Sequence, residues 1–276
     1  MRAPAGPLPV DPADDAKLTG ELAELKAEAE RRADEWHATG SSYAASSFND
    51  ASAFFSTGLG ARYSHDAQIS FMPGGVSADL IRNQLNMDGA KLFDDVDKAY
   101  APDAEVVTLI IQLELPRSAG EIVIESADPA APPRIDMNYY ADPVDLKVMV
   151  NAMRRGLDIA ANWPGAAKLG PWTAPPELSR KHGHVSGERP SDALLENTAL
   201  HFSHTTYHLS CTCRIGRVVD SRLRVFGVKN LRVADASVMP EITSGNINAV
   251  VIMIGEKAAE IVATDHGVKL RQFAGD

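Results

Sequence analysis

Thr205-Thr-Tyr-His-Leu-Ser-Cys-Thr-Cys-Arg-Ile-Gly216 is the first of four short runs that decide the fold of this chain. The other three are Leu231-Arg-Val-Ala-Asp-Ala-Ser-Val-Met-Pro240, Thr243-Ser-Gly-Asn-Ile-Asn248 and Ile252-Met-Ile-Gly-Glu-Lys257. The second run predicts a strand over residues 231–234 that ends in Asp235. The third is a polar turn, after which a helix is expected over 249–264. A strand that ends in an acidic residue, followed by a polar turn at a helix N-terminus, is typical of a fold that holds a polar cofactor.

The rest of the chain mixes helix and strand patterns without regular βα alternation. Apolar spacing predicts helices over residues 12–38, with Gly40 as the stop, and over 142–161 and 192–201. Alternating apolar residues predict strands over 68–72, 106–115 and 120–126, the last two forming an antiparallel hairpin. The Gly- and Pro-rich stretch 165–190 predicts a surface excursion. Antiparallel strands with packed helices favour the α+β class.

Composition excludes several classes of protein. The chain has 276 residues, 45% of them apolar and 23% charged, as in an ordinary globular protein. A net charge of −10 disfavours nucleic acid as a partner. No apolar run reaches the roughly 20 residues of a membrane span. The first residues lack the apolar core of a secretory signal, which makes a cytoplasmic location the default expectation.

In order and spacing, the four runs resemble the C-terminal part of the glucose–methanol–choline (GMC) family of flavin oxidoreductases, choline dehydrogenase-like in type. That family carries Tyr-His-Pro-x-Gly-Thr-Cys-Arg-Met-Gly, Leu-Arg-Val-x-Asp-x-Ser-x-Met-Pro and Asn-Thr-Asn-Ala-Pro, followed by Ile-Gly-Glu-Lys/Arg. Weaker family-like sequence occurs at residues 115–120, 126–129 and 133–145. The resemblance implies an antiparallel-sheet substrate domain with helices, plus the C-terminal segment of an FAD-binding α/β domain. We therefore expect an N-terminal helical segment at 1–40, a substrate-binding domain at 41–201 and an FAD-contacting segment at 202–276.

A phosphate-binding turn is the part of a flavoenzyme that this sequence does not supply. Gly58-Leu-Gly60 is the nearest match to Gly-x-Gly-x-x-Gly, but the third glycine is missing and no acid follows a clean βαβ pattern. The family carries this motif in an N-terminal half. We therefore expect a missing or separate N-terminal FAD-binding half to be the partner of this chain.

Two side chains are the candidates for chemistry on a small-molecule alcohol. The resemblance implies that His208 is the base, and a neutral imidazole suits removal of a hydroxyl proton near neutral pH. It implies that Asn246 holds the alcohol oxygen, since an amide donates to a developing alkoxide without titrating. A core histidine and a helix cap are the alternatives, and Asn248 fits the cap better than Asn246 does.

The resemblance also implies which residues contact FAD: Asp235, Ala236, Ile247 and Asn248. Asp235 could instead be a turn residue at the end of its strand. The sequence departs from the family at Cys211, where a glycine is usual. Glycine permits backbone angles that cysteine resists, so this change puts close backbone packing in doubt.

A zinc site is the rival interpretation of the histidines and cysteines between residues 201 and 213. Cys211 and Cys213 are one residue apart, a poor spacing for one tetrahedral ion, and the GMC run already accounts for Cys213. We expect no metal. The sequence thus predicts the C-terminal part of an FAD-dependent GMC-type alcohol oxidase or dehydrogenase that moves hydride to flavin. The alternative is a non-catalytic remnant or interaction subunit without its own FAD-binding half.

Overall fold

The computed structural model describes residues 12–40, 51–59, 65–73, 107–168, 170, 172 and 176–270. Much of the segment 41–75 lies outside these residues, as does Gly60. The chain divides into two compact units, Met1–Asp50 and Ala51–Asp276, each of which is described by itself. The boundaries expected after residues 40 and 201 stay predictions. Among the described residues, no helix has both the length and the apolar character needed to cross a membrane.

The first unit contains helix α1 (Pro12–Thr39), close to the predicted 12–38. Gly40 ends it with a φ of 68°, and its backbone N–H donates to the Trp36 carbonyl at 2.7 Å. A positive φ costs glycine little, which makes it a common C-terminal residue of helices. Glu28 pairs with both Arg31 and Arg32 on the surface of α1, so these charges form a solvated face.

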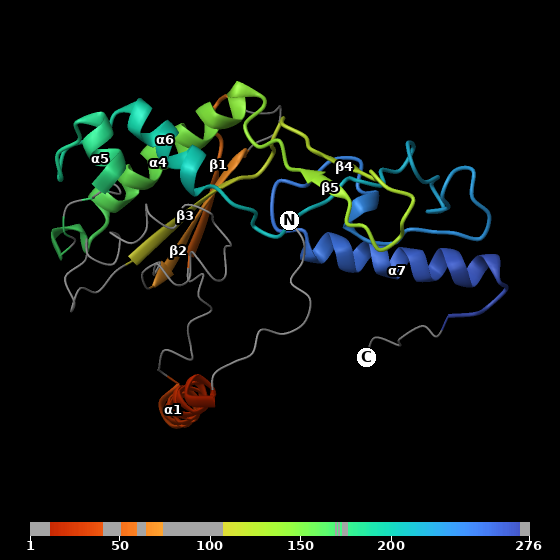
Figure 1. The fold of residues 1–276 in the computed structure, drawn as a ribbon, viewed down its shortest axis with the longest axis horizontal. Helices are drawn as coiled ribbons and strands as arrows, with labels where there is room; N and C mark the ends of the chain where they lie inside the picture. The colour runs from red at the N-terminus through yellow and green to blue at the C-terminus, as the bar shows by residue number, and fades with distance from the viewer. Residues whose placement is uncertain are drawn as a thin grey trace. The chain divides into compact units, whose positions relative to one another are not determined.

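The second unit is built on an antiparallel sheet in the order β1-β2-β3, with β1 at Ala51–Phe55, β2 at Ala67–Pro73 and β3 at Val107–Leu113. Ile69 of β2 pairs with Ile111 of β3. Helices α4, α5 and α6 group beside this sheet in Figure 1. Gly156 of α4 lies against the sheet so closely that a Cβ there would be 3.1 Å from Ile111 Cδ1. The antiparallel sheet with packed helices confirms the predicted α+β class.

Helix α4 (Pro143–Asn162) begins where the sequence predicted, and its first turn also anchors a loop. The Asp142 carboxylate caps the helix by accepting from Val144 N at 2.9 Å. Asp145, 1% exposed, accepts from the backbone N–H groups of Arg117 and Ser118 at 2.9 and 2.8 Å. A buried carboxylate therefore ties the chain after β3 to the start of α4.

The predicted hairpin of residues 106–115 and 120–126 is wrong. Strand β4 (Glu121–Val123) pairs with β5 (Arg134–Asp136), while β3 pairs with β2. Arg134 joins the two short strands by donating to Glu121 and Glu125. Alternating apolar residues predict a strand but do not specify its partner, and Asp145 fixes the loop that separates β3 from β4.

The stretch 165–190 is only partly a surface excursion. It contains the short 3₁₀ turn η3 (Ala166–Lys168) and helix α5 (Pro176–His182). Leu178 of α5 is 2% exposed and packs against Leu194 of α6 (Asp192–Phe202). The predicted helix at 192–201 is confirmed, with Ser191 as its N-cap.

Residues 202–270 contain the 3₁₀ turn η4 (Ala236–Val238) and helix α7 (Asn248–Asp265) around one apolar cluster. Its buried members include Val219, Leu223, Val238 and Ile254. The strand expected at 231–234 is absent from this described segment: an isolated bridge joins Arg232 to Arg224. Backbone hydrogen bonds flank this bridge, from Val225 N to the Leu231 carbonyl and from Val233 N to the Leu223 carbonyl, but the pairing extends no further into a ladder.

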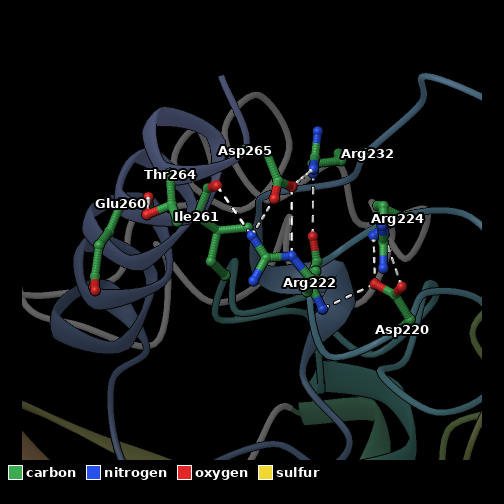
Figure 2. Close-up of polar contacts among 8 residues, drawn as sticks. All are labelled: Asp220, Arg222, Arg224, Arg232, Glu260, Ile261, Thr264 and Asp265. Carbon is green, nitrogen blue, oxygen red and sulfur yellow. Dashed lines mark hydrogen bonds and ion pairs between the residues drawn. The ribbon is translucent and has the colours of Figure 1, made fainter. Parts of the chain in front are cut away.

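A cluster of charged side chains holds the end of α7 against the loop before η4 (Figure 2). Asp265 pairs with both Arg222 and Arg232, and Arg222 also donates to the Ile261 carbonyl at 3.4 Å. Beside them, Asp220 pairs with Arg224. Cations suit the carbonyl end of a helix, so this cluster stabilises the last turn of α7.

Candidate functional site

The two predicted chemical residues meet in the structure. The side-chain nitrogen Nδ2 of Asn246 lies 3.0 Å from Nε2 of His208. His208 is half-buried and Asn246 is exposed. The amide nitrogen of Asn246 donates to Nε2 of His208 when that ring nitrogen carries no hydrogen. The second N–H of the Asn246 amide can serve another oxygen placed beside the two side chains.

His208 occupies a turn that neighbouring backbone groups hold in place. The φ angles of Tyr207 and Cys211 are 62° and 72°, both in the left-handed region. Farther along, the N–H groups of Cys211, Cys213 and Ile215 donate to carbonyls of residues 236, 237 and 238, at 3.3, 2.8 and 3.0 Å. The first and second sequence runs are therefore hydrogen-bonded to each other. Cys211, where the resemblance leads us to expect glycine, adopts this left-handed angle at the cost expected of a residue with a Cβ.

The N-terminus of α7 faces the same site without a side-chain cap. Its N-cap residue is Ile247, which is 8% exposed and belongs to the apolar cluster, and no side-chain cap hydrogen bond is made there. Asn248 is the first helical residue, so the expectation that it caps the helix is wrong. Asn246 does not cap the helix either, since its amide contacts His208. The first N–H groups of a helix carry partial positive charge and attract anionic or electron-rich groups.

Asp235 and Ala236 lie in a turn rather than at the end of a strand. Asp235 is exposed, and its carboxylate accepts from Ser237 N at 2.8 Å and from the Ser237 hydroxyl, thereby capping η4. The Ala236 carbonyl accepts from Cys211 N. The local contacts of Asp235 therefore agree with the alternative interpretation, in which it is a turn residue. A role for Asp235 toward a cofactor stays a prediction.

Sequence reasoning missed a link between this site and the sheet. Nε2 of His65 lies 3.1 Å from Oγ of Ser244, two residues before Asn246. The His65 ring also meets Phe54 of β1 edge-on, with centroids 5.7 Å apart. Glu114, 7% exposed, lies near His65: burial raises the pKa of its carboxyl, and the nearby His65 opposes that rise. No motif marks these residues, because their contacts join distant parts of the chain.

The sheet face that carries Phe54 is mixed: Met72 and Ile110 share it with a group of polar side chains. Gln68, 4% exposed, donates to Ser52 Oγ at 3.3 Å and to Ser70 Oγ at 3.0 Å, and Gln112 donates to Ser70 Oγ at 3.2 Å. Apolar residues of the same strands face α4. The sequence signal was present in β2, where Gln68 and Ser70 alternate with Ala67 and Ile69.

No group of three or more His, Cys, Asp or Glu side chains in the part of the chain that the structure describes could hold a metal ion. Cys211 and Cys213 are free thiols, both half-buried. The expectation of no metal stays a prediction that elemental analysis of the purified protein can test.

Comparison with known proteins identifies the family. The GMC oxidoreductase family model matches residues 116–255. Over 151 residues the chain is 37% identical to mitochondrial choline dehydrogenase of Mus musculus, covering 52% of this chain and 24% of that protein. It is 40% identical to alcohol dehydrogenase [acceptor] of Pseudomonas putida over 152 residues, or 54% of this chain and 26% of the relative.

A solved structure supports the same assignment. Formate oxidase of Aspergillus oryzae RIB40, studied for modification of its FAD, has a TM-score of 0.55 and 27% identity, covering 75% of this chain and 33% of that protein. The chain thus belongs to the GMC oxidoreductase family, whose members are FAD-dependent flavoenzymes, and the resemblance seen in the sequence is confirmed. It spans about a quarter of the length of the two relatives.

Proposed function

We propose that this chain is the C-terminal part of an FAD-dependent GMC-type oxidoreductase that oxidises an alcohol. The observation that carries the proposal is the contact between His208 and Asn246 beside the uncapped N-terminus of α7. A base and a neutral donor on one substrate oxygen are the groups that removal of a hydroxyl proton requires. The choline and alcohol dehydrogenases among the relatives support an alcohol as the substrate class.

In this proposal each side chain has one task. A substrate hydroxyl replaces the Asn246 amide as the hydrogen-bond donor to Nε2 of His208, because the single lone pair of that nitrogen accepts one hydrogen bond. Asn246 donates to the same oxygen and stabilises the negative charge that grows there as the proton leaves. FAD, when bound, supplies the acceptor for the hydride from the carbinol carbon, which no side chain can supply.

The residues on this side of the site fit a flavin. The free N–H groups at the start of α7 suit the electron-rich edge of the ring system. Ile247 and Asn248 stand at that helix end, and Asp235 with Ala236 forms the adjoining turn. No described residue provides a glycine-rich turn for the pyrophosphate, so these residues would hold only one side of the cofactor.

Exposed apolar side chains support a partner that covers the C-terminal segment. Large apolar residues stand 48% to 60% exposed on α7 and on the loops around it: Leu209, Phe226, Val228, Leu231, Ile252 and Met253. Several exposed apolar residues within one segment are a sign of an interaction surface. We propose that an N-terminal FAD-binding half covers them.

Expression with and without that half tests the proposed function. We expect the chain alone to carry no flavin, and the chain produced together with a GMC N-terminal half to show stoichiometric flavin absorbance and dye-linked alcohol oxidation. A stable complex without flavin would favour the non-catalytic subunit instead. Stoichiometric FAD on the chain alone would show that the chain itself holds a complete cofactor site.

A further inference from the structure

His65 connects the β-sheet to the turn that carries Asn246. The hydrogen bond between His65 Nε2 and Ser244 Oγ, 3.1 Å long, joins residues 179 positions apart. Ser244 begins the tripeptide Ser-Gly-Asn, so the contact acts on the backbone that positions the Asn246 amide. Both partners are half-buried, which protects the bond from competing water.

The backbone on the sheet side of this contact is held in place. Asp66, next to His65, is 1% exposed and accepts from the Thr57 N–H and hydroxyl, each at 2.8 Å. Its own N–H donates to the Phe55 carbonyl at 3.1 Å, and its carbonyl accepts from Glu114 N at 3.0 Å. The His65 ring also packs on Phe54. The imidazole therefore projects from a rigid base.

The turn on the other side has few internal restraints of its own. The Thr243 hydroxyl donates to the Gly245 carbonyl at 3.2 Å. Gly245 lies beside Phe54, since a Cβ there would be 3.9 Å from the Phe54 ring. The following residue, Asn246, has an exposed side chain that is hydrogen-bonded to His208. An exposed side chain is held by the backbone that carries it, so the position of this turn matters.

We propose that His65 is a positioning residue, which holds the Ser244–Asn246 turn so that the Asn246 amide faces His208. His65 does not touch the reacting atoms and acts through Ser244. The consequence for catalysis rests on the proposed function, whereas the effect on the position of Asn246 does not. A misplacement of about 1 Å in a catalytic group can cost on the order of 10²-fold in rate.

Three variants distinguish the effect of the His65–Ser244 hydrogen bond from the effect of packing between the His65 ring and Phe54. His65→Phe keeps a ring against Phe54 and loses Nε2. His65→Gln keeps a polar group within reach of Ser244. Ser244→Ala removes the partner and leaves the sheet untouched, which guards against a His65 variant that does not fold. Ser221→Ala, an exposed serine next to the charged cluster at the C-terminal end of α7, is the matched control.

The first readout is nuclear magnetic resonance of the Asn246 side-chain amide and the His208 ring in the full chain of 276 residues. We expect His65→Phe and Ser244→Ala to move both signals in the same way, with no further movement in the double variant. We expect His65→Gln to return them toward the parent positions, and Ser221→Ala to leave them unmoved. Unmoved signals in both His65→Phe and Ser244→Ala would overturn the proposal.

The second readout is the rate of flavin reduction by an alcohol. His65→Phe and Ser244→Ala should each lower it by about 10- to 10²-fold, with the thermal unfolding midpoint nearly unchanged. Movement of the two signals in His65→Phe and Ser244→Ala, together with a His208→Ala variant that reduces flavin as fast as the parent does, would refute the proposed function. That result would leave the positioning role of His65 standing. If His208→Ala slows flavin reduction while His65→Phe and Ser244→Ala leave both signals at the parent positions, the proposed function stands and the positioning role of His65 is refuted.

Discussion

The amide nitrogen of Asn246 lies 3.0 Å from the imidazole Nε2 of His208, although 38 positions separate the two residues in the chain. The contact is possible because residues 211–215 are hydrogen-bonded to residues 236–238, and α7 begins directly after Asn246 and Ile247. A base and a donor held this close can act on one oxygen atom. Their separation thus supports the two roles proposed above, proton removal by His208 and charge stabilisation by Asn246.

Loss of either side chain should slow the chemical step. We expect His208→Ala to lower the rate of flavin reduction by about 10²- to 10⁴-fold, because a positioned base contributes that much. Asn246→Ala should cost about 10²- to 10³-fold, as removal of an oxyanion donor does. Stopped-flow measurement on the chain combined with its N-terminal half provides the rates.

The same experiment includes its own controls. Because both residues serve one oxygen, the double variant should lose less than the product of the two single losses. Thr206→Ala, an exposed residue two positions before His208, should keep the parent rate. A His208→Ala enzyme as fast as the parent would remove this residue from the mechanism.

Backbone strain at Cys211 should reverse the usual order of glycine and alanine. With a φ of 72°, any residue with a Cβ is disfavoured there by about 1–2 kcal/mol, and glycine is not. We therefore expect Cys211→Gly to have a free energy of unfolding about 1 kcal/mol higher than Cys211→Ala. Urea unfolding of the two variants measures this difference in the free energy of unfolding. Both variants lack the thiol, so the effect of its loss cancels.

Cys213 provides the comparison, because its φ angle is not positive. There the glycine variant should be less stable than the alanine variant, because glycine loses more backbone entropy on folding. If alanine were also the more stable residue at position 211, the left-handed conformation of Cys211 would be incorrect.

The carboxylate of Asp145 should be important for stability. Both of its oxygens accept backbone N–H groups, from Arg117 and Ser118, in a site that is 1% exposed. Asn at this position offers one acceptor and turns an NH₂ group toward a backbone donor. We expect Asp145→Asn to lower the free energy of unfolding by about 1–3 kcal/mol. Asp158→Asn, which breaks an exposed pair with Arg189, should cost less than about 1 kcal/mol. Equal losses in the two variants would argue against the buried cap.

The cluster around Asp265 should make part of the stability depend on pH. The hydrogen bond from Arg222, followed by the charges of Arg222 and Arg232, lowers the pKa of Asp265 below its usual 3.8. A lowered folded-state pKa means that the stabilisation is complete above the unfolded-state value and is lost as pH falls through the folded-state value. Asp265→Asn should therefore melt at a lower temperature than the parent at pH 7.

The difference in melting temperature between Asp265→Asn and the parent should narrow as the pH falls through the lowered folded-state pKa of Asp265, where the parent carboxylate also becomes protonated. Glu260→Gln removes an exposed pair with Lys257 on the same helix and should change the melting temperature little at either pH. A constant gap over the whole pH range would contradict an electrostatic origin.

Helices and the candidate pair were accessible from the sequence for local reasons. Apolar spacing and caps lie within a few residues of each other, so α1, α4, α6 and α7 were predicted to within a few residues. The runs around His208 and Asn246 are also local, so the sequence alone points to both residues. The resemblance to the GMC family that is visible in the sequence rests on the same runs.

Tertiary structure decided the contacts that join distant segments. It paired β4 with β5 rather than β3, left residues 231–234 without a strand, and placed His65 against Ser244. It also used Asp235 to cap η4 and left α7 without a side-chain cap. Partners of this kind are chosen by register, burial and competition for backbone hydrogen bonds across the whole fold. A linear pattern of residue types contains none of that geometry, because each residue's own preferences are compatible with more than one partner.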